Sequence, residues 1–155
     1  MDLNSGEWRE IADLNNIDHV AGTQQSDLLR GDAGVNTIDG QAGSDFIQGE
    51  GGNDTLRGGG GADRFVYGSI NDGVDIILDF TRGPSGDVLD IHEVLQGHGS
   101  GSNLNDYVRL SEEGAGTMVS VNADGIGSDF VNLALLQGLG GFFLSNLLVE
   151  GNLIV

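Results

Sequence analysis

A glycine returns at every ninth position through much of the first half of the chain. Five nine-residue units begin at Gly22, Gly31, Gly40, Gly49 and Gly58. Each unit carries Asp or Asn at its sixth place and an apolar residue at its eighth place. One apolar position in nine does not make a helix face, whereas a three-residue strand needs only one inward side chain. The other six residues of each unit must therefore form a turn.

Two such units make one coil, and successive coils stack as parallel strands around a thin core. The core is predicted to consist of the eighth-place residues Leu29, Ile38, Ile47, Leu56 and Phe65. The predicted fold class is all-β: a parallel β-roll of nonapeptide repeats, followed by a small mixed β cap with one or two short helices. A flexible Gly/Asp-rich linker is the alternative, but a linker does not keep an apolar column in phase.

Stacking also brings the sixth-place side chains of alternate units together. Asp27, Asp45 and Asp63 are predicted to line one edge of the roll, and Asn36, Asp54 and Asp72 the other. Two carboxylates at such a spacing repel each other by about 3 kcal/mol at an effective dielectric constant near 20. A hard cation between them reverses the sign. Carboxylates together with backbone carbonyls form an all-oxygen shell, which suits the flexible coordination of Ca2+ better than the strict octahedron of Mg2+.

The charge balance limits the possible partners. The chain has 24 acidic residues against 6 basic ones, which are all Arg, and a net charge of -18. Nucleic acid and anionic membrane surfaces are excluded as partners because both attract positive charge. The chain has no Cys, which excludes disulfides, cysteine zinc sites and a thiol nucleophile. No apolar run is long enough for membrane insertion, and the N-terminus lacks a cleavable secretory signal.

The nonapeptides resemble a known family. The segments GEGGNDTLR (49–57) and GGGGADRFV (58–66) are similar to the GGxGxDxUx repeats of repeats-in-toxin (RTX) proteins, with NNIDHVAGT as lead-in and YGSINDGVDIILDF as exit. This resemblance implies several Ca2+ ions, bound by sixth-place side chains and by carbonyls of the glycine loops. It implicates Asp45, Asp54 and Asp63 first and Asp27 next. Gln24 and Gln25 in the first loop and the neutral Asn36 predict weaker sites there.

The complete set of predicted metal ligands combines side chains with loop residues. The side chains are Asp27, Asn36, Asp45, Asp54, Asp63, Asp72 and Asp79, and the loop residues are Gly31, Ala33, Gly34, Gly40, Ala42, Gly43, Gly49, Gly51, Gly52, Gly58, Gly60 and Gly61. Asp79 and its neighbour Asp75 alternate with apolar residues. Either they complete the last calcium site with Asp63 or Asp72, or they are solvated strand residues.

The second half of the chain resembles the C-terminal target domain of type I secretion substrates, particularly the end of very large RTX adhesins of Gram-negative bacteria. The resemblance implies an uncleaved signal that a type I secretion transporter reads, a larger parent polypeptide N-terminal to this segment, and a secreted or cell-surface location. The expected division is a lead-in over 1–21, the roll over 22–80, and a cap with the secretion signal over 81–155. The alternative is the C-terminal module of an RTX protease or lipase, which only the upstream sequence separates from an adhesin.

Propensities outline the cap. They predict a strand over 74–80, a short helix over 90–96, a hairpin of 107–111 with 117–121, a strand over 130–135, a helical turn over 145–150 and a final strand at NLIV. FFLSNLLV and NLIV are expected to be core in the folded state, which is compatible with a signal in the unfolded state.

Other motifs carry less function. HEVLQGH (92–98) has Gln96 where a zinc protease needs its second His, and the chain has no GxSxG elbow, so no catalytic residue is predicted. NADGIGSD (122–129) is either an ordinary hairpin turn or an extra Ca2+ loop of Asn122, Asp124 and Asp129. The outward seventh and ninth places are mixed, which excludes a flat ice-binding array. A glycan-binding role has no residue-level support.

Overall fold

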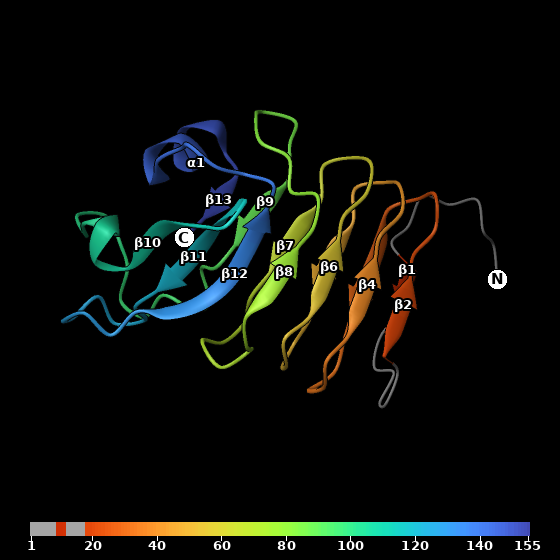
Figure 1. Ribbon diagram of the computed structural model, residues 1–155, viewed down its shortest axis with the longest axis horizontal. Helices are drawn as coiled ribbons and strands as arrows, with labels where there is room; N and C mark the ends of the chain where they lie inside the picture. Colours follow the sequence, from red (N-terminus) through yellow and green to blue (C-terminus); the bar gives the residue numbers. More distant parts are fainter. Residues whose placement is uncertain (1–8, 12–17) are drawn as a thin grey trace.

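Short parallel strands dominate the structure, a computed structural model that describes residues 9–11 and 18–155 (Figure 1). Most of the predicted lead-in, residues 1–21, lies outside the described residues. The strands of the roll are β1 (Arg9–Ile11), β2 (His19–Ala21), β3 (Asp27–Arg30), β4 (Thr37–Asp39), β5 (Phe46–Gln48), β6 (Thr55–Arg57), β7 (Arg64–Val66), β8 (Asp75–Ile77) and β9 (Val88–Asp90). The structure confirms the predicted all-β class and the parallel β-roll.

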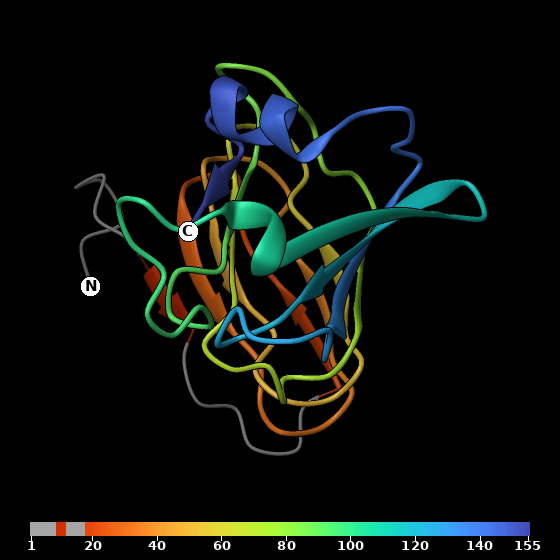
Figure 2. The same cartoon turned by 90° about the vertical axis from the view of Figure 1, so that its left-hand side faces the viewer.

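The strands alternate between two sheets, as the coil prediction requires. One sheet has the order β1-β3-β5-β7-β9-β13 and the other the order β10-β11-β12-β8-β6-β4-β2. Within the repeats the parallel partners are eighteen residues apart, as in Leu29 with Ile47 and Ile38 with Leu56. Figure 2 shows the coils lying one behind another.

The register lengthens where the repeats end. Thr55 pairs with Ile76 and Arg64 pairs with Val88, so the last two coils contain three and six more residues than a regular coil. The extra residues lie in the loops after β7 and β8, because the strands themselves keep their length of three residues. The glycine period is lost after Phe65, yet the stacking continues.

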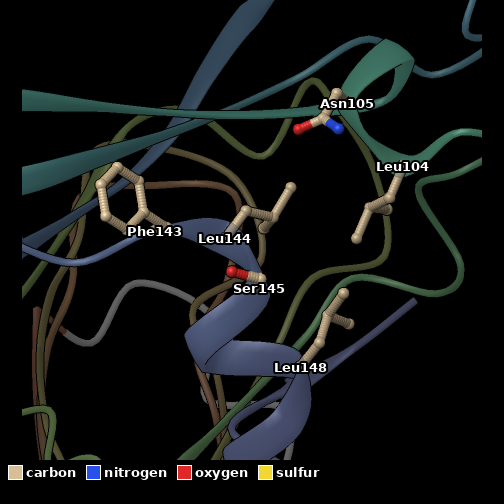
Figure 3. A pocket seen from close by; sticks show the side chains of 6 residues that line it. All are labelled: Leu104, Asn105, Phe143, Leu144, Ser145 and Leu148. Atoms are coloured by element: carbon tan, nitrogen blue, oxygen red, sulfur yellow. The ribbon is translucent and has the colours of Figure 1, made fainter.

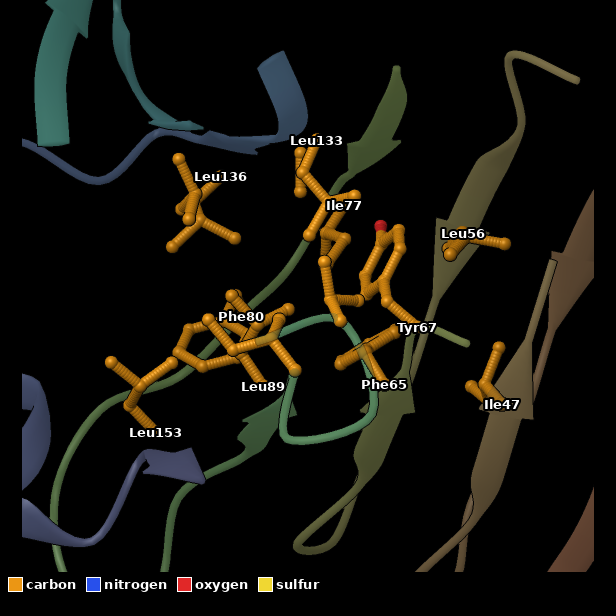
Figure 4. Close-up of a cluster of buried hydrophobic side chains, with 14 of the residues drawn as sticks. Ile47, Leu56, Phe65, Tyr67, Ile77, Phe80, Leu89, Leu133, Leu136 and Leu153 are labelled. Carbon is orange, nitrogen blue, oxygen red and sulfur yellow. The ribbon is translucent and has the colours of Figure 1, made fainter. Parts of the chain in front are cut away.

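One continuous hydrophobic core runs from the roll into the second half of the chain (Figure 4). The eighth-place residues Leu29, Ile38, Ile47, Leu56 and Phe65 are at most 1% exposed, as predicted. Tyr67, Ile77, Phe80 and Leu89 continue the column beyond the last repeat, and Leu133, Leu136 and Leu153 cover its end. The two sheets therefore carry the roll's packing across residue 81 without a break in the core.

The second half adds an antiparallel meander to one sheet and a terminal strand to the other. The meander consists of β10 (Val108–Glu113), β11 (Gly116–Val121) and β12 (Val131–Gln137), and β12 pairs parallel with β8. Strand β13 (Leu153–Ile154) pairs with β9 after helix α1 (Leu144–Glu150), and η1 (Leu104–Asp106) precedes β10. The predicted hairpin, third strand, helical turn and final strand are confirmed.

The helix predicted over 90–96 is wrong. Asp90 still belongs to β9, and the amide of Ile91 donates to the carbonyl of Ile154 at 3.0 Å, which keeps the chain beside the terminal strand. Turns follow, in which Val94 and Leu95 reach the core. Sheet pairing with a distant segment has overridden the local helix preference. Among the described helices, none has the length and apolar character needed to cross a membrane.

Candidate metal centre

The buried acidic side chains form two rows that we call the carboxylate ladder. In each row, the backbone amide of one member donates to a carboxylate one coil further along. These bonds run from Asp27 to Asp45, from Asn36 to Asp54, from Asp45 to Asp63, from Asp54 to Asp75 and from Asp63 to Asp87, with N–Oδ1 distances of 2.8–2.9 Å. Each of these carboxylates thus accepts from a backbone amide at the start of a strand or one residue before it. The predicted stacking of residues eighteen apart is confirmed within the repeats.

The predicted stacking of Asp72 on Asp54 is wrong, because Asp75 takes that place. The insertion after β7 moves the next ladder residue three positions along the chain. Asp72 instead closes its own loop by accepting hydrogen bonds from the amides of Gly68 (3.1 Å) and Ser69 (2.9 Å). Sequence reasoning missed Asp87 altogether and left Asp75 open. Both precede two apolar residues, Ile76–Ile77 and Val88–Leu89, and this resembles the end of a repeat unit.

Five ladder carboxylates have one oxygen without a hydrogen-bond partner: Asp27 at Oδ1 and four others at Oδ2. The Oδ2 atoms of Asp45, Asp54, Asp63 and Asp75 are buried and unpaired, and each of these residues is about 1% exposed. An ionised carboxylate in such a place costs several kcal/mol unless a cation or a donor reaches it. These oxygens are therefore hard anionic donors of the kind that a cation such as Ca2+ pairs with.

The pKa values of these four carboxyl groups reflect the cost of burying their charge. Burial is the largest cause and raises the pKa of Asp45, Asp54 and Asp63 to about 6, although the bond from the preceding coil's amide lowers it in each case. Neighbouring carboxylates add to the rise, such as Asp63 for Asp45 and Asp72 for Asp54. The pKa of Asp75 rises to about 7 for the same reasons. The Tyr67 hydroxyl lies close enough to lower it slightly, but not in hydrogen-bonding geometry.

Threonines occupy the ends of one row. Asp27 Oδ2 accepts hydrogen bonds from the amide (2.6 Å) and hydroxyl (2.9 Å) of Thr23. Asp87 Oδ2 accepts the same pair from Thr81, at 2.7 and 3.1 Å. At both ends of the row, protein donors thus bind the Oδ2 atom. In Asp45 and Asp63, in the middle of the row, the same atom has no partner.

Two other predicted ligands also have protein partners. Asn36 Oδ1 accepts from the Asp32 amide at 2.8 Å, and its Nδ2 donates to Asp32 Oδ1 at 3.3 Å. Asp79 accepts from the amide of Gly58 (3.0 Å) at Oδ1 and of Gly59 (2.9 Å) at Oδ2, and it faces Arg57. Asp79 therefore anchors a glycine loop.

The first-place glycines make room for these oxygens. A Cβ on Gly40 would stand 2.3 Å from Asp45 Oδ2 and 2.6 Å from the carbonyl oxygen of Gly58. A Cβ on Gly49 would likewise stand 2.1 Å from Asp54 Oδ2. The fourth-place glycines approach the backbone instead: Gly61 has φ +137°, and its Cβ would lie 1.7 Å from the carbonyl oxygen of Gly43. A carboxylate and loop carbonyls therefore crowd together where a side chain would otherwise be.

Gly49→Ala tests this close packing. We expect the substitution to destabilise the folded, calcium-loaded chain by about 2 kcal/mol, because the new methyl group overlaps Asp54 Oδ2. Gly60→Ala is the matched control, since a Cβ there meets nothing within 4 Å. Urea denaturation of both variants in saturating Ca2+ measures the difference. Equal midpoints for the two variants would contradict the packing argument.

Side chains alone do not complete a metal site. Among the described residues, no three His, Cys, Asp or Glu side chains come together in a group that could hold a metal ion. Each coil contributes only one carboxylate to each row. The remaining ligands of any metal site must therefore be backbone carbonyls or water. This donor set is compatible with Ca2+, which accepts carbonyl oxygens readily, and unsuited to zinc.

The other motifs and the cleft offer no comparable chemistry. In the 122–129 segment, Asn122 Nδ2 donates to the carbonyl of Ile126, and Asp124 accepts from the Ile126 amide at 2.9 Å, so both side chains shape the turn. A cleft of about 300 Å3 between η1 and α1 is lined by Leu104, Asn105, Phe143, Leu144, Ser145 and Leu148 (Figure 3). None of these lining residues is titratable at neutral pH.

The comparisons with known proteins agree with this geometry. Residues 14–47 and 39–74 match the family model of the RTX calcium-binding nonapeptide repeat (4 copies). The chain therefore carries RTX calcium-binding repeats, which form a structural calcium-binding module and are typical of secreted proteins. A search of curated proteins finds no match.

A solved structure has the same fold. The chain is similar to the solution structure of the AlgE6R3 subunit from the Azotobacter vinelandii mannuronan C5-epimerase, with a TM-score of 0.54 and 24% sequence identity. The match covers 86% of this chain and 72% of that one. At this identity the likeness concerns the β-roll architecture.

Proposed function

We propose that the chain is a non-catalytic module that folds when Ca2+ binds along the carboxylate ladder. The observation that carries the proposal is the set of four buried carboxylate oxygens without a partner, on Asp45, Asp54, Asp63 and Asp75. The RTX repeats support Ca2+ as the ion. We assign these four side chains as the principal ligands, together with carbonyls of the adjacent glycine loops.

The other predicted ligands take a smaller part in this proposal. Asp27 contributes its unpaired Oδ1, because Thr23 holds its other oxygen. Asn36 and Asp72 serve as loop anchors, since groups of their own loops occupy them, and Asp79 anchors the separate loop of Gly58 and Gly59. The loop carbonyls are those of Gly31, Ala33, Gly34, Gly40, Ala42, Gly43, Gly49, Gly51, Gly52, Gly58, Gly60 and Gly61.

Calcium dependence would suit an exported protein. Extracellular Ca2+ modules bind with affinities of about 0.1–1 mM, far above the free Ca2+ of a cytosol. The chain would stay unfolded inside the cell, helped by its net charge of -18, and fold outside. We propose that residues 81–155 form a C-terminal cap that contains a type I secretion signal, behind a lead-in (1–21) and a roll (22–80), at the end of a large cell-surface adhesin of a Gram-negative bacterium. A type I secretion transporter would then be its export partner.

An exported enzyme is the second candidate parent. An RTX protease or lipase is the alternative larger polypeptide, and the solved structure with the same roll architecture is likewise a subunit of an enzyme. The module itself would act in export and folding in either case. The coding sequence upstream of this segment separates the two parents. Co-expression with a type I transporter tests export, which should be lost when residues 142–155 are deleted.

Asp54→Asn tests the ladder as the calcium site. We expect the variant to need about tenfold more Ca2+ for half-maximal folding, because a neutral amide replaces a charged ligand. In EDTA the same variant should be more stable than the parent chain, because a buried unpaired charge is gone. Circular dichroism during Ca2+ titration measures the first effect, and the concentration of a stabilising osmolyte that refolds each chain in EDTA measures the second.

The exposed Asp129→Asn is the matched control, since it removes the same charge outside the ladder. It should leave the Ca2+ concentration for half-maximal folding close to that of the parent chain. Its free energy of unfolding in EDTA should lie within about 0.5 kcal/mol of the parent value. If Asp54→Asn and Asp129→Asn give the same calcium midpoint, the assignment of the ladder is wrong.

A further inference from the structure

The C-terminal segment, residues 150–155, closes over the loop 81–87 that follows the roll. Asn152 is about 1% exposed and makes three hydrogen bonds to this loop. Its Nδ2 donates to the carbonyls of Asp87 (2.7 Å) and Gly83 (3.1 Å), and its Oδ1 accepts from the Gly83 amide at 2.9 Å. One buried amide thus ties the middle of the loop to its end.

Neighbouring contacts hold the same segment. The Arg82 guanidinium makes two bonds to Glu150, at 2.9 and 2.7 Å, and lies 4.6 Å from the centre of the Phe142 ring. The amide of Leu89 donates to the carbonyl of Asn152 at 2.9 Å, which continues the pairing of β9 with β13. Loop 81–87 therefore has the C-terminal segment as a tertiary partner on one side.

On its other side, the loop meets the carboxylate ladder. Asp87 Oδ1 accepts from the Asp63 amide at 2.9 Å, and the amide of Val88 donates to the carbonyl of Asp63 at 2.7 Å. Asp63 is also a residue with an unpaired buried Oδ2. Only the backbone of Asp87 separates the Asn152 amide from the ladder bond of Asp63.

We propose that Asn152 is a positioning residue for the calcium site at Asp63, and that ion binding there and docking of residues 150–155 stabilise each other. This inference rests on the proposed function and deepens it, because it makes the C-terminal segment accessible only when the site lacks calcium. Coupling of this kind is reciprocal: an ion that fixes Asp63 and Asp87 favours docking, and docking favours the ion by the same factor. Groups that orient metal ligands in this way typically change metal affinity by about 10- to 100-fold.

Amide hydrogen exchange of the full chain during a Ca2+ titration tests the inference. The variant is Asn152→Asp, which keeps the shape and the acceptor but removes the donor to Asp87 and Gly83. The control is Asn146→Asp in α1, where the side chain accepts from the Phe143 amide and has no bond to loop 81–87. In the parent chain, residues 81–91 and 150–155 should become protected at the same Ca2+ concentration.

In Asn152→Asp, the concentration that half-protects residues 81–91 should rise about tenfold, while that for the amides of residues 37–57 stays at the parent value. Asp63→Asn should in turn release residues 150–155 in Ca2+ that keeps residues 37–57 protected. The inference is overturned if Asn152→Asp titrates like Asn146→Asp, or if residues 150–155 stay protected in Asp63→Asn. A parent chain whose exchange does not respond to Ca2+ would overturn the proposed function as well, so the two failures are distinguishable.

Discussion

In EDTA at neutral pH the chain should lose its β-sheet circular dichroism, and millimolar Ca2+ should restore it in one cooperative step. The physical reason lies in the four unpaired oxygens of Asp45, Asp54, Asp63 and Asp75. Raising a carboxyl pKa from 3.8 to about 6 corresponds to about 3 kcal/mol lost from the folded state when the group is ionised. Four such groups together are comparable with the roughly 5–15 kcal/mol that stabilises a folded domain. The calcium-free roll therefore lacks a stability margin.

Ion binding reverses this balance because the sites exist only in the folded chain. Binding free energy becomes folding free energy, which grows with the ratio of free Ca2+ to the dissociation constant. Mg2+ at the same concentration is the control, since it demands a tighter octahedral shell and keeps its water. Equal refolding by Mg2+ would contradict a site built from carboxylates and carbonyls. A spectrum in EDTA that matches the calcium-loaded one would show that the apolar column alone holds the roll.

Most of the roll could be predicted from the sequence because one physical rule governs every coil. A side chain that points inward must be apolar at the eighth place and a hydrogen-bond acceptor at the sixth place. The period of nine therefore predicted both the buried column, from Leu29 to Phe65, and the stacking of Asp45 between Asp27 and Asp63. These features are local to the repeat and recur in phase.

The same reasoning failed where the loops lengthen. Counting nine residues from Asp63 leads to Asp72, whereas the structure uses Asp75 and Asp87. The ladder selects residues by their position before a strand, and an insertion in a loop does not disturb that position. An Asp followed by two residues that resemble the end of a unit is thus a better signal than the count.

The second half shows a different limit of sequence analysis. The local pattern of residues 90–96 favours a helix, yet the Ile91 amide donates to the carbonyl of Ile154, some sixty residues away. The side-chain bonds of Asn152 to loop 81–87 have no local signal either, because they join segments that become neighbours only after β13 pairs with β9. Contacts of this kind depend on the tertiary structure.

Acid should replace calcium in stabilising the roll. In EDTA, lowering the pH from about 7.5 to about 5 should raise the free energy of unfolding by roughly 5 kcal/mol. The folded chain binds more protons than the unfolded chain in this range, because burial raises the pKa of Asp45, Asp54 and Asp63 to about 6 and that of Asp75 to about 7. Stability from these groups is fully present below the ordinary value of 3.8 and is lost as the pH rises through 6 to 7.

A pH of about 5 is the right endpoint because another buried carboxylate acts in the opposite direction. Burial raises the pKa of Asp90, but hydrogen bonds from His92 and Arg64 outweigh it and lower the pKa below 3.8. Asp90 thus stays ionised and paired at about pH 5, and its contribution is lost only at lower pH. Refolding by a stabilising osmolyte in EDTA at several pH values, followed by circular dichroism, measures the effect. Sedimentation confirms that the chain stays dispersed above its pI of about 4.1.

Asp54→Asn gives the internal control for this titration. The variant lacks one of the four titrating groups, so its stability in EDTA should rise less steeply between about pH 7.5 and pH 5 than that of the parent chain. With saturating Ca2+ the pH dependence should reverse, because protons then compete with the ion for the same oxygens. A calcium-free chain that is equally unstable at both pH values would mean that the buried carboxylates do not govern folding. The ladder would then be a consequence of the roll's stacking and not the device that controls it.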